Sequence, residues 1–335
     1  MSTRDRIACL GAGRMGRGIA VVFAYAGHEV AVVDFKPRAS ADFERLAGQA
    51  RTEIRATLQS LARFGLFDEA AVDAIAARAS VVPEAAAARA LPAAAVVFEG
   101  VPEVLALKRD ALARASALMA PQTILASTTS TILVDDLAGS VVEPHRFLNA
   151  HWLNPAYLVP LVELSPGNLT DPAVTARLKA LLEAIGKVPV VCAPRPGYIV
   201  PRIQALAMNE AARLVEEGVA TPEEIDKAIR YGFGFRFAVL GMLEFIDWGG
   251  GDILAYASHY LASALGDARY AAPAIVERNM REGRIGLKTG VGFLDYAGRD
   301  LDAYRTERLK ALVAMLAHMG LVRAPILDTA PDRST

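Results

Sequence analysis

The pattern that most restricts the fold of this chain lies in its first 34 residues. Ile7–Leu10 is a short apolar run, and Glu29–Val33 is a second one that leads directly to Asp34. Between them, apolar residues recur at helical spacing up to Gly27, which stands where a C-terminal cap would. The turn before this helix fits G-x-G-x-x-G with Gly11, Gly13 and Gly16. We therefore predict a strand, a helix and a strand that form a dinucleotide site.

Each glycine of this turn has a separate physical role. The first permits a tight turn, the second lets a pyrophosphate approach the backbone, and the third lets the helix pack closely on the strand. A carboxylate at Asp34 accepts hydrogen bonds from a ribose diol and repels a 2′-phosphate, so the sequence favours NAD over NADP. Lys36 and Arg38 follow closely; they would either receive a phosphate or lie in an ordinary solvated turn.

The rest of the chain divides into two patterns. Up to residue 193, strand-like runs alternate with helical segments such as 42–64 and 107–119, which predicts an α/β fold: a doubly wound, mostly parallel Rossmann sheet covered on both faces. The further expected strands are Ala94–Phe98, Thr123–Ala126, Arg146–Asn149, Leu161–Leu164 and Val188–Val191. A Pro- and Gly-rich boundary at 194–197 precedes a region where only helices are expected, at 202–217, from 221, and at 238–247, 252–264, 273–282 and 302–319.

These patterns predict an NAD-binding domain with the catalytic histidine over 1–193 and an all-helical substrate and dimerisation domain over 194–298. A C-terminal helix and tail follow over 299–335, with the tail frayed from residue 323.

Composition excludes several classes of function. A net charge of −1 over 335 residues gives no reason to expect a nucleic acid or an anionic membrane as partner. Cys9 and Cys192 are the only cysteines, too few for a disulfide framework or a cysteine-based metal site. No stretch approaches the roughly 20 apolar residues that a membrane span needs. We expect a soluble, cytoplasmic protein without a metal.

A second group of polar residues lies near strand ends. His151 ends one expected strand and Glu163 lies in the next, and parallel neighbouring strands would bring both to one edge of the sheet. Histidine can take a hydroxyl proton near neutral pH, and a carboxylate on its other nitrogen fixes the tautomer and stabilises the charged ring. A strand-end histidine can also be purely structural. The other histidines lie in expected turns or helices without such company: His28, His145, His259 and His318.

Ordered motifs continue along the whole chain. They are Gly11–Gly16, Glu99–Glu103 with Lys108, Ser127–Ser130, His151–Pro155, Leu161–Leu164, Pro196–Val200, Gly241–Glu244 leading to Asp247, and Gly286–Phe293. In this order and spacing the chain resembles the L-3-hydroxyacyl-CoA dehydrogenase family, whose pattern is S-N-T-S, then H-x-x-N-P, then a strand carrying glutamate. The resemblance implies an NAD-dependent oxidoreductase of fatty-acid metabolism and a homodimer.

The resemblance also implies roles for individual residues. His151 would be the general base, oriented by Glu163, and Ser130 would bind the substrate oxygen beside the nicotinamide. Asn154 would help to position the ring and the substrate carbonyl. Contacts with the dinucleotide are expected from Gly11, Gly13, Met15, Gly16, Asp34, Glu103, Lys108 and Lys288. Duller interpretations exist: Ser130 could cap a turn, Lys108 could lie on a solvated helix face, and Asn154 with Pro155 could merely shape a turn.

The chain departs from the family pattern at three places. Pro201 stands where the family usually has an asparagine that contacts the substrate. Thr128 stands at a different position where the family usually has an asparagine. The helix expected at 42–64, in the region where the family contacts coenzyme A, carries arginines and no lysine. These changes leave dehydrogenase chemistry plausible and put the acyl-CoA substrate in question.

Three functions therefore compete. The first is oxidation of a short-chain L-3-hydroxyacyl-CoA, such as 3-hydroxybutyryl-CoA, to the 3-ketoacyl-CoA. The second is NAD-dependent oxidation of a free 3-hydroxy acid, as in the related carnitine or gulonate dehydrogenases. The third is binding of NAD without catalysis, against which Ser130, His151 and Glu163 argue because a sensor has no need of a base and its orienting acid.

Overall fold

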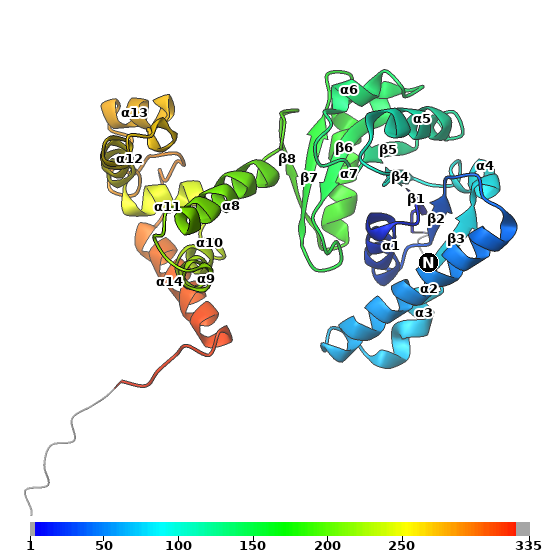
Figure 1. Cartoon of the computed structure of the whole chain (residues 1–335), viewed down its shortest axis with the longest axis horizontal. Coiled ribbons are helices and arrows are strands. Elements are labelled where there is room, and N and C mark those ends of the chain that lie inside the picture. Colours follow the sequence, from blue (N-terminus) through cyan, green and yellow to red (C-terminus); the bar gives the residue numbers. More distant parts are fainter. Residues whose placement is uncertain (1–3, 326–335) are drawn as a thin grey trace, which may run out of the picture. The chain divides into compact units, whose positions relative to one another are not determined.

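A computed structural model describes residues 4–325 of the chain. The chain splits into two compact units, Met1–Met208 and Asn209–Thr335, and each is described by itself (Figure 1). The division falls inside helix α8 (Val200–Glu216), whereas the sequence pattern indicated a boundary at 194–197. Most of the tail predicted to fray, residues 326–335, lies outside the described residues.

The first unit is built on an eight-stranded sheet in the order β3-β2-β1-β4-β5-β6-β7-β8. Its strands are β1 (Ile7–Leu10), β2 (Val30–Asp34), β3 (Ala79–Pro83), β4 (Val96–Glu99), β5 (Ile124–Ser127), β6 (Phe147–Trp152), β7 (Leu161–Pro166) and β8 (Val188–Val191). Neighbouring strands are parallel except for β6 and β7, which confirms the predicted doubly wound, mostly parallel sheet. The strand β3 was not predicted, because it is an edge strand with few strongly apolar residues that ends at a proline.

Helices cover both faces of this sheet, as buried parallel strands require (Figure 1). One core includes Phe23, Leu58 and Leu178, which come from helices on one face; the other includes Leu112 and Leu137. The first face is covered by α1 (Arg14–Tyr25), α2 (Ser40–Arg63), α3 (Val72–Ala76) and α7 (Pro172–Ala184). The second is covered by α4 (Ala87–Ala90), α5 (Leu105–Ser116) and α6 (Val134–Ala138).

The pairing of β6 with β7 corrects one expectation. His151 and Glu163 were predicted on parallel neighbouring strands, but these strands are antiparallel. The connection, residues 153–160, is shorter than the crossover of about a dozen residues that a parallel pair needs. The antiparallel register sets His151 directly opposite Glu163.

The second unit is helical, with two isolated β-bridges, Gly286–Val291 and Val291–Asp295. Its helices are α9 (Pro222–Ala228), the π-helical turn Ile229–Gly234, α10 (Phe235–Phe237), α11 (Met242–Gly249), α12 (Gly251–Leu265), α13 (Ala274–Arg281) and α14 (Leu301–His318). The helix expected at 238–247 begins later, because the Gly241 N–H donates to the Glu244 carboxylate at 3.0 Å and Gly241 caps the helix. Within the described residues, no helix is long and apolar enough to span a membrane.

Candidate active site

The glycine turn follows β1 and opens α1, as the sequence predicted. Gly11 has φ +95°, and a Cβ on it would lie 3.0 Å from the Gly100 carbonyl oxygen. A Cβ on Gly16 would lie 2.1 Å from the Gly11 carbonyl oxygen, so only glycine permits this packing. A Cβ on Gly13, in contrast, would meet nothing within 4 Å. The space in front of Gly13 and the N-terminus of α1 fits the pyrophosphate of a dinucleotide.

A pocket of about 400 Å³ lies in front of this turn, lined by Gly11, Gly13, Asp34 and the start of the segment after β4. Asp34 is buried at the end of β2, and its Oδ2 accepts from Arg38 Nε at 2.5 Å. Arg38 is thus paired with the carboxylate rather than held ready for a phosphate. The residues of this pocket fit NAD.

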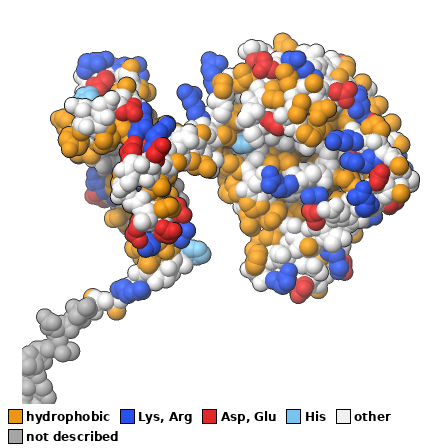
Figure 2. All heavy atoms as spheres, in the orientation of Figure 1, with side chains coloured by type: hydrophobic (Ala, Val, Ile, Leu, Met, Phe, Trp, Pro, Cys, Tyr) orange, Lys and Arg blue, Asp and Glu red, His pale blue; other side chains and the backbone are white. Residues whose placement is uncertain are grey.

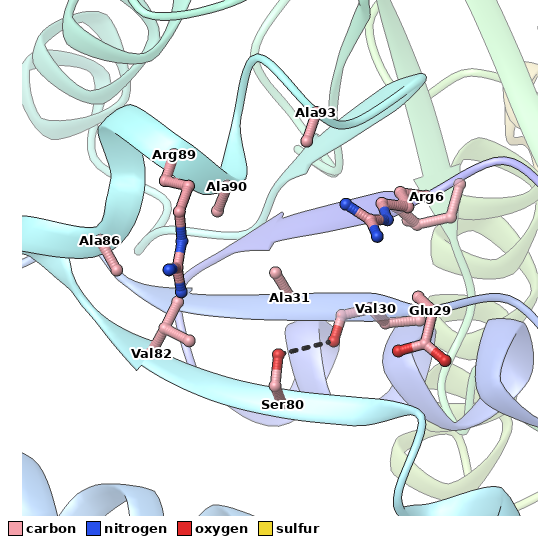
Figure 3. A pocket seen from close by; sticks show the side chains of 11 residues that line it. Arg6, Glu29, Val30, Ala31, Ser80, Val82, Ala86, Arg89, Ala90 and Ala93 are labelled. Atoms are coloured by element: carbon pink, nitrogen blue, oxygen red, sulfur yellow. Dashed lines mark hydrogen bonds between the residues drawn. The ribbon is translucent and has the colours of Figure 1, made fainter.

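A larger pocket of about 620 Å³ lies at the other end of the strands, beside the first residues of β1 and β2 (Figure 3). Figure 3 shows Arg6, Glu29 and Arg89 around it, and the Ser80 hydroxyl that donates to the Val30 carbonyl. In open parallel sheets ligands bind at the carboxyl ends of the strands. Size alone therefore does not make this pocket the active site.

The pair His151 and Glu163 forms the centre of the candidate site. Both side chains are buried, and His151 Nδ1 lies 2.8 Å from Glu163 Oε2. The other carboxylate oxygen of Glu163 accepts from the backbone N–H groups of Ile199, at 2.9 Å, and Val200, at 2.8 Å. These N–H groups lie at the N-terminal end of α8, where a negative charge is stabilised.

The surroundings of Glu163 keep it ionised. Burial by itself would raise the pKa of this carboxyl, but the hydrogen bonds from His151, Val200 and Ile199 lower the pKa below its usual value. An ionised carboxylate on Nδ1 leaves Nε2 as the ring nitrogen that can take a proton. The arrangement is that of a general base with its orienting acid.

Two other histidines also have carboxylate neighbours. This corrects the expectation that His151 alone lies beside a carboxylate. His259 Nε2 lies 2.7 Å from Glu277, and His145 Nδ1 lies 3.2 Å from Glu143. His259, His145 and Glu143 are exposed and Glu277 is half-buried, all in helices or turns. Burial of the carboxylate, rather than mere pairing, distinguishes His151.

The loop that carries Ser130 is held by Glu103. Glu103 Oε1 accepts from the backbone N–H groups of Ser130 and Thr131, both at 3.0 Å, and from the Thr129 hydroxyl. Burial alone would raise the pKa of Glu103, but the Thr129 hydrogen bond, the charge of Lys108 and the Thr131 hydrogen bonds lower it. Ser130 itself is exposed, so its hydroxyl is open to a ligand.

Lys108 does not lie on a solvated helix face. It is 1% exposed, and its Nζ lies 2.9 Å from Glu99 Oε1 and 3.3 Å from Glu103 Oε2. Glu99 is itself buried and accepts from the Ser127 hydroxyl at 2.5 Å. This buried pair was missed by the sequence argument, although Glu99 and Lys108 belong to the same motif. A direct contact of Lys108 with the dinucleotide stays a prediction.

The remaining predicted residues lie at different places. Met15 is half-buried in the first turn of α1, and Asn154 is exposed and precedes Pro155 with a cis peptide bond. Lys288 belongs to the second unit, where its ammonium lies 3.2 Å from Asp252. Within the described residues, no group of three or more His, Cys, Asp or Glu side chains could hold a metal ion.

The sequence argument missed Asn149 and Tyr198. Asn149 precedes His151 by two residues on β6 and therefore points to the same face of the sheet. The Tyr198 ring stacks on the His151 ring, with centroids 5.2 Å apart and planes 14° apart. The strand period of two around His151 could have identified Asn149. Tyr198 lies in the Pro196–Val200 motif, but nothing in that motif predicts its contact with His151.

The departures from the family pattern have clear positions. Pro201 lies in the first turn of α8, where proline is well tolerated. Thr128 is buried after β5, and its N–H donates to the Glu99 carbonyl at 2.9 Å. Three of the four arginines of α2 lie near acids: Arg45 near Asp42 at 2.9 Å, Arg51 near Glu44 at 3.9 Å, and Arg55 near Asp73 at 2.6 Å. Arg63, the fourth, donates instead to the Gln59 carbonyl at 3.4 Å.

Comparison with known proteins matches both halves of the chain. Residues 6–195 match the family described as 3-hydroxyacyl-CoA dehydrogenase, NAD binding domain, and residues 197–296 match its C-terminal domain. A 5-formyl-3-hydroxy-2-methylpyridine 4-carboxylate 5-dehydrogenase of Mesorhizobium japonicum is 31% identical over 92% of this chain and 96% of its own. A probable 3-hydroxybutyryl-CoA dehydrogenase of Bacillus subtilis is 32% identical over 87% and 97%.

Among solved structures, a 3-hydroxyacyl-CoA dehydrogenase of Archaeoglobus fulgidus is 30% identical, with a TM-score of 0.75 over 95% of this chain and 100% of its own. Fold, motifs and the two family matches agree on one assignment. The chain belongs to the 3-hydroxyacyl-CoA dehydrogenase family of oxidoreductases, and its cofactor is NAD.

Proposed function

We propose that this enzyme oxidises the 3-hydroxyl group of a short-chain L-3-hydroxyacyl-CoA to the 3-ketone, with reduction of NAD. The observation that carries the proposal is the buried pair of His151 with Glu163, because oxidation of an alcohol needs a base for the hydroxyl proton. The two family matches and the relative from Bacillus subtilis support the thioester substrate.

The chain's own residues would divide the proton chemistry between them. Bound NAD would take the hydride that leaves C3. His151 Nε2 would take the hydroxyl proton, while Glu163 holds the ring by Nδ1 and stabilises its positive charge. Two backbone N–H groups on Glu163 lower its proton affinity, so the proton stays on the histidine. In the reverse reaction the same nitrogen would return the proton to the carbonyl oxygen.

The binding residues follow from the same proposal. Ser130 would hydrogen-bond the substrate oxygen, and Asn154 would position the substrate carbonyl. Asp34 would bind the adenosine ribose in the pocket in front of the glycine turn. Further contacts with the dinucleotide would come from Gly11, Gly13, Met15, Gly16, Glu103, Lys108 and Lys288.

A second candidate is oxidation of a free 3-hydroxy acid. Arg45, Arg51 and Arg55 of α2 already pair with carboxylates, which reduces the positive charge that this helix offers to the phosphates of coenzyme A; Arg63 is the arginine of α2 that bonds to Gln59 and Ser60 instead of an acid. Pro201 in addition supplies no side-chain amide. A relative from Streptomyces coelicolor that is named L-carnitine dehydrogenase, 35% identical over 80% of this chain, is consistent with this candidate.

One assay separates these candidates. Purified protein is given NADH with acetoacetyl-CoA and, in parallel, with acetoacetate and other free 3-keto acids. Turnover of the thioester supports the first proposal, and turnover of only a free acid replaces it with the second. If neither is turned over, NADH binding is measured in the protein and in His151→Ala; equal binding without activity in either would indicate a non-catalytic NAD protein.

We also propose that the second unit forms a contact with a second copy of the chain. Figure 2 shows apolar atoms over its surface, and the exposed residues include Tyr256, at 72%, and Tyr260, at 71%, on α12. Contiguous exposed apolar side chains of this size are typical of interfaces. Light scattering of the purified protein tests this: a mass of twice 35.6 kDa is expected, and a single-chain mass would contradict the proposal.

A further inference from the structure

Tyr198 joins three parts of the candidate site through one side chain. Its ring stacks on His151, and its hydroxyl accepts from Asn149 Nδ2 and donates to the Thr129 carbonyl, each at 3.0 Å. The side chain is 7% exposed. Burial raises the pKa of the hydroxyl, so it remains a donor over the whole working pH range.

The backbone at this position is unusual for such a residue. Tyr198 has φ +43°, and among residues 4–325 it is the one non-glycine residue with a positive φ. A bulky side chain in the left-handed region costs free energy, which surrounding contacts must offset. The next two residues, Ile199 and Val200, donate their N–H groups to Glu163. The same turn therefore places the Tyr198 ring against His151 and two backbone N–H donors against Glu163.

Asn149, two residues before His151 on β6, adds further hydrogen bonds to this arrangement. It is fully buried, and its Nδ2 donates both to the Tyr198 hydroxyl and to the Ile132 carbonyl at 2.9 Å. Thr129 and Ile132 flank Ser130 in the loop. The hydroxyl of Tyr198 and the amide of Asn149 thus tie this loop to the strand that carries His151.

We propose that Tyr198, through its hydroxyl, is a positioning residue that fixes the Ser130 loop relative to the His151 ring. The inference rests on the proposed role of His151 as the base. Tyr198 touches neither substrate nor cofactor in this proposal. Its hydrogen bonds hold two groups that must both reach one substrate hydroxyl, where small displacements strongly reduce the rate.

The test replaces Tyr198 by phenylalanine, which keeps the ring and the turn and removes only the hydroxyl. Thr123→Val is the matched control, since it also removes a buried hydroxyl, one that donates to the Ala94 carbonyl at 2.7 Å near the amino end of β5. We expect Tyr198→Phe to lower kcat about ten-fold with an unchanged KM for NADH, and Thr123→Val to leave kcat unchanged. An equal effect in both variants, or none in Tyr198→Phe, overturns the proposal.

Two further measurements separate positioning from a merely structural role. In the double variant Asn149→Leu with Tyr198→Phe, the fold-decrease in kcat should be clearly smaller than the product of the two single fold-decreases, because both residues hold the same connection. A decrease equal to that product contradicts the proposal. The second measurement is exchange of the Ser130 backbone amide proton, followed by NMR in protein without substrate, because the Tyr198 hydroxyl holds this loop at the neighbouring Thr129 carbonyl. It should be several-fold faster in Tyr198→Phe than in Thr123→Val.

The exchange measurement also separates this inference from the proposed function. If the wild-type protein turns over no 3-keto substrate, the proposed function fails, and the exchange rates alone decide the role of Tyr198. Equal rates in Tyr198→Phe and Thr123→Val then overturn it.

Discussion

Replacement of Glu163 by glutamine tests the central pair with almost no change of shape. Glu163 Oε1 accepts two backbone N–H groups, so the amide oxygen of the glutamine must occupy that position. Its NH₂ group then faces His151 Nδ1, which is 2.8 Å away in the wild type. Nδ1 must accept, and the ring proton moves to Nε2, where the substrate proton should go. The substitution therefore produces the wrong tautomer as well as removing a charge.

We expect Glu163→Gln to lower kcat roughly 10²–10⁴-fold, because in a triad with the same logic the wrong tautomer costs about 10⁴. At about 1.36 kcal/mol per factor of ten, this is a loss of about 3–5 kcal/mol of transition-state stabilisation. The acidic limb of the kcat/KM profile for oxidation should also move to lower pH, because the charge that stabilises the protonated ring is absent.

Steady-state kinetics from pH 5 to 9, with NADH affinity measured by fluorescence, check this prediction. Glu277→Gln is the control, since it removes the exposed partner of His259 and should change neither rate nor profile. A Glu163→Gln rate within about three-fold of wild type, together with an unmoved acidic limb, would refute the pairing.

The same carboxyl predicts a dependence of stability on pH. The pKa of Glu163 is lowered in the folded protein. Its contribution is therefore present above the unfolded value of about 4.3 and is lost as the pH falls through the lower folded value. In urea unfolding between pH 7 and 3, the free energy of unfolding should fall less steeply with decreasing pH in Glu163→Gln than in wild type. An identical dependence on pH would contradict the lowered pKa.

The other predictions concern base and cofactor. His151→Ala should lower kcat at least about 100-fold with NADH affinity nearly unchanged in titration calorimetry; parallel loss of both would indicate a structural histidine. Asp34→Ala should reduce the ratio of kcat/KM for NAD over NADP, and an unchanged ratio would mean that the ribose is bound elsewhere. Gly16→Ala should lower both Tm and NADH affinity, since its Cβ would lie 2.1 Å from the Gly11 carbonyl oxygen. Gly13→Ala, whose Cβ meets no protein atom within 4 Å, should weaken NADH binding but keep Tm; a matching fall in Tm would contradict a phosphate role for that space.

Much of the fold could be predicted because its signals are local. The run Ile7–Leu10 and the turn ending at Gly16 are found where their periodicity and glycine spacing indicated. The strand β3 escaped prediction because its sequence, Ala-Ser-Val-Val-Pro, has only two strongly apolar residues and ends at a proline. The direction of β7 escaped because it depends on the length of a connection, 153–160, rather than on the composition of the strand.

The candidate site was predictable only in part, for a similar reason. His151 and Glu163 stand out as polar residues in apolar strands, and their motif made them recognisable. Tyr198 contacts residues 47, 49 and 69 positions earlier in the sequence, and no local pattern predicts such long-range contacts. Lys108 is a second example. A lysine on a helix is expected in solvent, but the charge of Glu99 makes the burial of this lysine possible.

The contact between His151 and Glu163 and the departures from the family pattern involve different side chains. His151 and Glu163 face each other across β6 and β7, and their geometry depends on strand register and on the turn before α8. Of the three departures, Thr128 follows β5, Pro201 comes directly after Val200 in the first turn of α8, and the arginines lie on α2. None of them contributes an atom to the contact between His151 and Glu163. Relatives named for a thioester and for a free carboxylate are each about equally similar to this chain, as expected if substrates change through such peripheral positions. Selection among 3-hydroxy substrates should therefore respond to changes at Pro201 and α2, while the proton transfer continues to depend on His151 and Glu163.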